Sequence, residues 1–483
     1  MSSSLKLQGL KAVAWDFFGK IAKFGTTFVV TVVLARLLEP SDFGLIAMVM
    51  VVVMVAMIFT DVGLGSALIQ RRRVLPIHYD SVFYFNICIG GILTFVTFFS
   101  ATWISEFYGN EQLVSLTQAI SLVFIINSFG SMQSTKLRKE LNYAALAKAN
   151  VSAAILSGIT GISLALYGAG VWSLVAQILT RGVFYNIFVW IASNWIPSLM
   201  FSFKALKQLW GFGFRMFLSS LLDAVYNQLD VLIIGKLFTP ATLGFFGQAK
   251  KLNALIIQFS SGSIMAVMFP VLSKIQNDLP RFQNVAIKIL GIISLIAFFL
   301  SGALYVVSHE LIALLFTDKW LPSVKYFKIL VLSGYAYPVS VILVNILSSR
   351  GNSKAFLRLE IYKKILQSIN LSMVFLWGIT GYLYGMLIIS FLGVFLNILF
   401  ASRELKLPFM AFAQPILVQM SIAIVSVFSV ILLTYEIELS NMVTILIKGI
   451  IFSVVYFAVN FVFKTSSYNY LMDQVESMIK RKF

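Results

Sequence analysis

The chain has 483 residues, of which 59% are hydrophobic and 12% are charged. Soluble domains are roughly 45–50% apolar and about 25% charged, so this composition excludes a water-soluble enzyme, a disordered chain and a soluble nucleic-acid-binding protein. The net charge of +18 is typical of a membrane protein with many topological Lys and Arg residues. With one cysteine and two histidines, the sequence predicts no internal disulfide and no metal centre.

Long apolar runs predict an all-α, polytopic membrane protein. A helix needs about 20 mostly apolar residues to cross a bilayer, and about fourteen runs of this kind are present. Asp16, Lys20 and Lys23 interrupt the first run, which excludes a signal peptide. In chain order the predicted spans are 12–38, 43–69, 80–104, 112–134, 144–167, 170–193, 208–238, 242–272, 284–307, 322–348, 356–379, 382–402, 409–435 and 442–463.

The connections between these spans alternate in charge. Basic residues collect before the first span, after every second span and in the C-terminal tail, for example at 71–73, 136–139, 350–358 and 480–482. Short loops rich in Lys and Arg stay in the cytoplasm. The sequence therefore predicts an even number of helices and two cytoplasmic termini.

The first hairpin has a second copy later in the chain. Residues 35–44 recur at 235–244 with the cation, Leu, Pro and Gly at the same places. This offset predicts two pseudo-two-fold-related six-helix lobes, a parallel repeat of the kind found in alternating-access transporters. The predicted domains are an N-lobe (1–198), a cytoplasmic linker (199–207), a C-lobe (208–403), two further helices (404–465) and an amphipathic tail on the cytoplasmic surface (466–483).

Polar residues form stripes inside the predicted spans. Asp16, Lys20, Lys23 and Thr27 share one face of the first helix, and a similar stripe from Arg215 to Asp230 follows the seventh. Charged residues in spans usually face a bundle interior or a water-filled cavity. We therefore expect a central cavity whose cations are Lys20, Lys23, Arg181, Arg215, Lys250 and Lys251. Its acids are Asp16, Asp61, Asp223 and Asp230.

An excess of cations suits a substrate that carries phosphate, because Arg offers a bidentate fork and Lys a point charge. Simpler interpretations stay open for several residues. Lys20 can reach the cytoplasmic surface, Arg215 can pair with an acid of its own lobe, and adjacent Lys250 and Lys251 cannot share one helix face. The acids either neutralise the cations or form a coupling site for H+ or Na+.

No catalytic signature is present. The chain lacks the P-loop pattern of ATPases, and its outward connections are too short for a catalytic domain. We therefore expect neither an enzyme nor a resident cofactor.

Several motifs resemble those of a known family. Residues 33–44, 61–70, 239–244 and 268–274 are similar to signatures of the polysaccharide transporter family, the Wzx-type flippases of the MATE/MurJ-like superfamily. The closest resemblance is to its colanic-acid and teichuronic-acid exporter branch. It implies fourteen helices in the bacterial cytoplasmic (inner) membrane and flipping of a polyprenyl-pyrophosphate-linked oligosaccharide. Such a substrate would be an exopolysaccharide, capsule or O-antigen unit. No residue is implied as a sugar ligand.

Three other functions stay open at this point: a MATE-like multidrug or cation antiporter, a peptidoglycan-precursor flippase, and a membrane polysaccharide polymerase or ligase. The expected partners of a flippase are the lipid-linked glycan, membrane lipids, and a polysaccharide polymerase with its export machinery. Nucleic acid is not expected.

Overall fold

The structure is a computed structural model that describes residues 3–435 and 439–480. The side chains of residues 3–10, 13, 212, 215, 219, 255–271, 475 and 477–480 lie outside this description. The described residues form helices and connecting turns without strands. Their contacts define two compact units, Met1–Gly247 and Gln248–Phe483.

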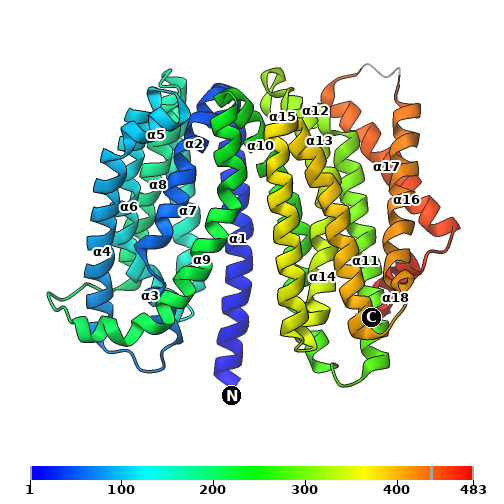
Figure 1. The fold of residues 1–483 in the computed structure, drawn as a ribbon, viewed down its shortest axis with the longest axis horizontal. Coiled ribbons are helices and arrows are strands. Elements are labelled where there is room, and N and C mark those ends of the chain that lie inside the picture. The colour runs from blue at the N-terminus through cyan, green and yellow to red at the C-terminus, as the bar shows by residue number, and fades with distance from the viewer. Residues whose placement is uncertain (1–2, 436–438, 481–483) are drawn as a thin grey trace. The chain divides into compact units, whose positions relative to one another are not determined.

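The first unit holds nine α-helices, one 3-10 helix and the first turns of α10 (Figure 1). Helix α9 curves along the unit and packs on α2, η1, α3 and α4. The elements are α1 (Ser3–Leu37), α2 (Pro40–Ala56), η1 (Met57–Thr60), α3 (Leu64–Gln70), α4 (Pro76–Phe99), α5 (Ala101–Tyr108), α6 (Gln112–Lys139), α7 (Tyr143–Leu166), α8 (Trp172–Ser193) and α9 (Phe203–Leu237).

The second unit is built around α11, which contacts α13, α14, α16, α17 and α18. Its elements, with α10 shared between the units, are α10 (Pro240–Lys274), α11 (Leu279–Val306), α12 (Ser308–Phe316), η2 (Asp318–Trp320), α13 (Ser323–Gly334), α14 (Ala336–Ser349), α15 (Ser353–Leu405), α16 (Phe409–Leu433), α17 (Asn441–Val462) and α18 (Ser466–Lys480).

The predicted polytopic helical fold is confirmed, because 12 helices in the described part of the chain are long and apolar enough to cross a membrane. One of them, α15, contains the predicted spans 356–379 and 382–402. Non-helical backbone at Trp377 (φ −129°, ψ 16°) and Gly378 (φ 66°, ψ −166°) divides α15 into two helices. The predicted span 242–272 lies within α10, which is not among the twelve. The count of fourteen stays a prediction.

The predicted span 43–69 is not one continuous helix. It breaks after α2 and η1, where Val62 (φ 44°) and Gly63 (φ 74°) adopt left-handed conformations before α3 begins. A Cβ atom on Gly63 would lie 2.2 Å from the carbonyl oxygen of Gly213 on α9. The break thus lets the backbone of α9 approach this point, as only glycine permits.

The helix boundaries at the repeated turn are the same in both copies. Helices α1 and α9 end at Leu37 and Leu237, and the next helices begin at Pro40 and Pro240. Proline is favoured at the first position of a helix because its missing N–H is not needed there. The structure thus confirms the matched hairpins predicted from the sequence.

A second matched segment lies where α6 and α14 end. Leu141 (φ 58°) and Gly351 (φ 75°) are left-handed, the usual way to end a helix. The following asparagine caps the next helix in each case, since Asn142 Oδ1 and Asn352 Oδ1 each accept a backbone N–H at 3.1 Å. The offset between these copies is about 210, close to that of the repeated turn.

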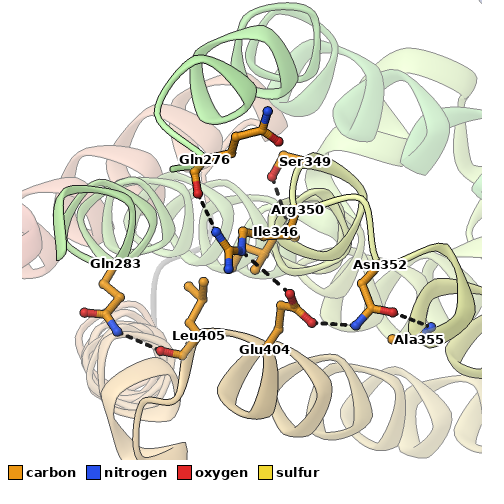
Figure 2. A network of polar contacts seen from close by, with 9 residues as sticks. All are labelled: Gln276, Gln283, Ile346, Ser349, Arg350, Asn352, Ala355, Glu404 and Leu405. Carbon is orange, nitrogen blue, oxygen red and sulfur yellow. Dashed lines mark hydrogen bonds and ion pairs between the residues drawn. The ribbon is translucent and has the colours of Figure 1, made fainter. Parts of the chain in front are cut away.

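A cation near each of these helix ends ties it to the end of an earlier helix. Lys139 Nζ donates to the carbonyl oxygen of Leu68 in α3. It also donates, at 2.6 Å, to the carbonyl oxygen of Arg71, which follows the end of α3. Figure 2 shows Arg350 donating to the carbonyl oxygen of Gln276, which follows α10, and facing Glu404 at 3.7 Å. Cations suit these carbonyl groups because they carry partial negative charge.

Buried polar contacts hold the last helices against α11 and α12. Tyr456 Oη on α17 donates to the carbonyl oxygen of Leu295 on α11 at 2.9 Å, and Lys448 Nζ on α17 forms a 2.6 Å ion pair with Glu310 on α12. The predicted amphipathic tail is the helix α18, which packs on α11. Its lying on the cytoplasmic surface stays a prediction.

We predict that Gly351→Ala lowers the free energy of unfolding by about 1 kcal/mol, because an L side chain is strained in the left-handed region. A Cβ on Gly351 would meet no atom within 4 Å, so the cost is in the backbone alone. Thermal unfolding in detergent, followed by tryptophan fluorescence, measures the change. Gly449→Ala is the control, because that helical glycine also faces open space. Equal melting temperatures for the two variants would contradict the prediction.

Candidate functional site

The polar face of α1 is brought against α7 by two close contacts. A Cβ on Gly19 would lie 2.5 Å from Ala147 Cβ, and one on Gly158 would lie 2.4 Å from Val30 Cγ2. Gly19 and Lys23 are four residues apart and therefore share a face of α1. As a result Lys23 is half-buried, unlike Lys20, which is exposed.

Two arginines act electrostatically on Lys23 at this face. Lys23 interacts electrostatically with Arg181 of α8 and with Arg138 in the last turn of α6. Arg181 is half-buried and Arg138 is exposed. None of the three side chains forms a hydrogen bond or an ion pair with the described residues of the chain. We call Lys23, Arg138 and Arg181 the cation cluster.

Like charges repel each other, and the repulsion grows where protein and lipid exclude water. Carboxylates usually pair with such cations in folded chains. The hydroxyl of Thr27, one turn beyond Lys23, is buried and has no hydrogen-bond partner. The cluster therefore offers charge and a hydroxyl donor to an anion.

Asp61 lies at the edge of this cluster, in the break between η1 and α3. Its carboxylate accepts the backbone N–H of Gly65 at 2.9 Å. A Cβ on Gly65 would lie 3.0 Å from both Asp61 Oδ2 and Thr135 Oγ1, which places the carboxylate beside the hydroxyl. Asp61 also interacts electrostatically with Arg138. Asp61 thus accepts a backbone N–H in the first turn of α3 and adds one negative charge that acts on Arg138.

The other predicted residues lie elsewhere. Lys20 Nζ forms a 2.6 Å ion pair with Asp16 Oδ2, and both side chains are more than a third exposed. On α9, Asp223 is exposed, and buried Asp230 accepts its neighbour's N–H at 2.8 Å. The side chain of Arg215 lies outside the described residues.

Lys250 and Lys251 belong to the second unit, where Lys250 is half-buried and Lys251 is exposed. Of the six predicted cavity cations, the structure therefore brings together Lys23 and Arg181.

Arg138 is the member of the cluster that the sequence analysis missed. The charge pattern places Arg138 in a basic loop, because the predicted span ends at residue 134, whereas α6 continues to Lys139. A usable signal was present, since Ser131, Thr135 and Arg138 are spaced four and three residues apart. This spacing puts them on one helix face.

These features define a polytopic helical membrane protein of transporter type, and comparisons with known proteins agree. The family model described as polysaccharide biosynthesis protein matches residues 33–325. The chain belongs to this family, as its motifs predicted.

Two relatives and one solved structure illustrate the similarity. The chain is 21% identical to the lipopolysaccharide biosynthesis protein WzxC of Escherichia coli (strain K12), over 75% of this chain and 74% of WzxC. It is 24% identical to the succinoglycan biosynthesis transport protein ExoT of Rhizobium meliloti (strain 1021), over 68% of this chain and 64% of ExoT. The fold is that of the lipid II flippase MurJ in an inward closed conformation, with a TM-score of 0.72 at 15% identity, covering 94% of this chain and 98% of MurJ.

We predict that Lys23→Met raises the melting temperature of the substrate-free protein, because it removes like-charge repulsion at a half-buried site. The same variant should lose most of the further stabilisation that added inorganic pyrophosphate gives the wild type, since ligand binding to the folded state raises its stability. Thermal unfolding with and without pyrophosphate measures both effects.

Lys20→Met is the matched control on the same helix. Its exposed pair with Asp16 contributes only about 0–1 kcal/mol, so pyrophosphate should stabilise this variant as much as the wild type. Equal pyrophosphate responses of the two variants would contradict the assignment of the anion site to the cation cluster.

Proposed function

We propose that this protein is a flippase that moves a polyprenyl-pyrophosphate-linked oligosaccharide from the inner to the outer leaflet of the bacterial cytoplasmic membrane. The observation that carries the proposal is the cation cluster, three positive side chains without an ion-pair partner among the described residues. The family and the names of its relatives, a lipopolysaccharide biosynthesis protein and a succinoglycan transport protein, support the glycan as cargo.

The diphosphate is the part of such a substrate that is hardest to move. An ion transferred into hydrocarbon without partners costs of order tens of kcal/mol. Lys23 and Arg181 can replace water around the diphosphate, Lys as a point charge and Arg as a bidentate donor. The glycan needs a hydrated passage, whereas the polyprenyl tail can stay in lipid.

The proposal includes an orientation and a domain plan. Both termini and the basic connections lie in the cytoplasm, as the positive-inside rule requires. Residues 1–198 and 208–403 form two lobes joined by a cytoplasmic linker, and 404–465 adds two helices. The lobes alternate access by rocking, with Arg215, Lys250 and Lys251 lining the passage from the second half of the repeat.

A proton or sodium gradient drives the cycle in this proposal. Asp61 is the preferred coupling residue, because its charge acts on Arg138 of the cation cluster. Asp16, Asp223 and Asp230 are the alternatives from the polar stripes. The partners are membrane lipids, a polysaccharide polymerase and its export machinery.

A multidrug antiporter of the same fold is the second candidate among transporters. Such a carrier would need uncompensated acids for cationic drugs, whereas the three cations of this site, without an ion pair among the described residues, outnumber its one acid, Asp61. A polysaccharide polymerase or ligase would instead elongate the glycan.

Reconstituted vesicles test the proposal. We expect purified protein to move a fluorescent polyprenyl-pyrophosphate oligosaccharide between leaflets, and Arg181→Met to lower the initial rate at least tenfold. The loss of one charged hydrogen-bonding partner of a desolvated anion justifies this size. Lys20→Met should retain the wild-type rate. Wild-type vesicles that leave the lipid-linked glycan in place while expelling cationic dyes would favour the antiporter, and glycan elongation would favour the polymerase.

A further inference from the structure

Large apolar side chains are uncovered in the connection between α8 and α9. Leu199 is 95% exposed, Ile196 80%, and Phe203, the first residue of α9, 79%. Residues 194–215 lie between two candidate membrane spans, so these side chains do not belong to a helix that crosses the membrane. Single exposed apolar residues are ordinary on protein surfaces, but neighbouring ones of this size mark an interaction site. We call Ile196, Leu199 and Phe203 the apolar trio.

Helix α4 holds the backbone of this connection. Asp80, which is 1% exposed, accepts the backbone N–H of Ser198 at 3.1 Å and also its hydroxyl group. Ser81 Oγ accepts the backbone N–H of Ser202 at 2.9 Å. Leu199 lies between these two anchored serines in the sequence. The apolar trio is therefore uncovered on a segment whose backbone is fixed to the bundle.

Exposed cations adjoin the apolar trio. Arg71 Nη2 donates to Gln208 Oε1 at 2.6 Å, which brings the loop after α3 against the first turns of α9. Lys204 and Gln208 are four residues apart and therefore share a face of α9. Four cations of these two segments have exposed side chains that form no hydrogen bond or ion pair with the described residues. We call these residues, Arg72, Arg73, Lys204 and Lys207, the basic edge.

Tryptophans flank the same connection. Trp190 lies near the end of α8, Trp195 lies in the connection, and Trp210 lies in α9. These are three of the eight tryptophans of the chain, a concentration typical of the membrane–water boundary, where an apolar ring carries a polar N–H. Figure 1 shows the connection at the end of the first unit that holds the N-terminus of α1. In the proposed orientation this is the cytoplasmic end.

We propose that the apolar trio and the basic edge together form a docking surface for the cytoplasmic leaflet of the membrane. The trio enters the boundary between headgroups and acyl chains, and the basic edge binds anionic phospholipids. Apolar and cationic side chains in this combination are typical of segments that lie on anionic membranes. Ile196 follows the end of α8 by three residues, so the bilayer is within reach without a further protein. This inference uses the orientation of the proposed function but not the transport activity.

The backbone of the connection limits how deeply it enters the membrane. Residues 195–202 are not helical, so the backbone groups that α4 leaves open need water or headgroups as hydrogen-bond partners. Hydrocarbon offers neither. The backbone therefore stays among the headgroups while the side chains of the trio reach the first part of the acyl chains. In this way the linker between the two halves of the repeat is held at the membrane surface.

Fluorescence quenching tests where the trio lies. In a Cys88→Ser background, which removes the only cysteine, Leu199→Cys is labelled with nitrobenzoxadiazole, and the protein is reconstituted into vesicles that contain phosphatidylglycerol. Spin labels attached to lipid near the headgroup boundary should quench this label strongly. Aqueous acrylamide should quench it several-fold less than a label at Glu140→Cys, the control, which is exposed just after the last turn of α6. Acrylamide quenching equal to that of the control, without quenching by the lipid spin labels, would leave the trio to a soluble partner and overturn the proposal.

Charge substitutions test the basic edge. Lys204→Gln combined with Lys207→Gln should raise acrylamide quenching of the Leu199→Cys label several-fold, because it weakens the attraction to anionic headgroups. Replacing phosphatidylglycerol by phosphatidylcholine should have the same effect. Lys11→Gln combined with Lys148→Gln is the matched control, since both lysines are exposed and lie in other helices, α1 and α7. Equal quenching in the two double variants would overturn the assignment of anionic lipid to the basic edge.

These readouts do not need transport, so the two proposals can fail separately. A lipid-protected label on protein that does not flip the glycan would contradict the proposed function alone. A water-exposed label on active protein would contradict the docking surface alone.

Discussion

Like-charge repulsion among Lys23, Arg138 and Arg181 is the constraint on which the account of this protein depends. Three helices, α1, α6 and α8, bring these cations together, and no described residue forms an ion pair with them. Asp61 provides one negative charge from the break after η1. A net-positive site in a membrane protein is stable at small cost only with an anion or water in it. The arrangement in which the three cations repel each other can therefore also bind a diphosphate.

Close backbone contacts provide the positions that this electrostatic arrangement needs. Gly19 and Gly158 let α1 pack closely on α7, and Lys23 is half-buried as a result. Gly63 lets the backbone of α9 approach the break beside Asp61. Such contacts are a common way for membrane helices to associate, because lipid gives no hydrophobic driving force between them. The same device recurs at Gly44 and Gly244. Small residues thus decide which polar side chains meet.

The sequence predicted the helices and the repeat because apolar length and charge alternation are strong signals, as 35–44 and 235–244 show. It did not predict the break at Val62 and Gly63, since a local pattern does not reveal that α9 packs there. Arg138 was missed because a helix can extend past its apolar segment. Conversely, Lys20 and Lys23 share a stripe, but only packing on α7 shows that one is exposed and the other half-buried.

The most direct test is an experimental structure of the protein in lipid nanodiscs with its polyprenyl-pyrophosphate-linked glycan bound. The account predicts density for both phosphorus atoms beside the Lys23 ammonium and the Arg181 guanidinium, with Arg138 turned toward them. A bound diphosphate that contacts none of these three side chains would contradict it.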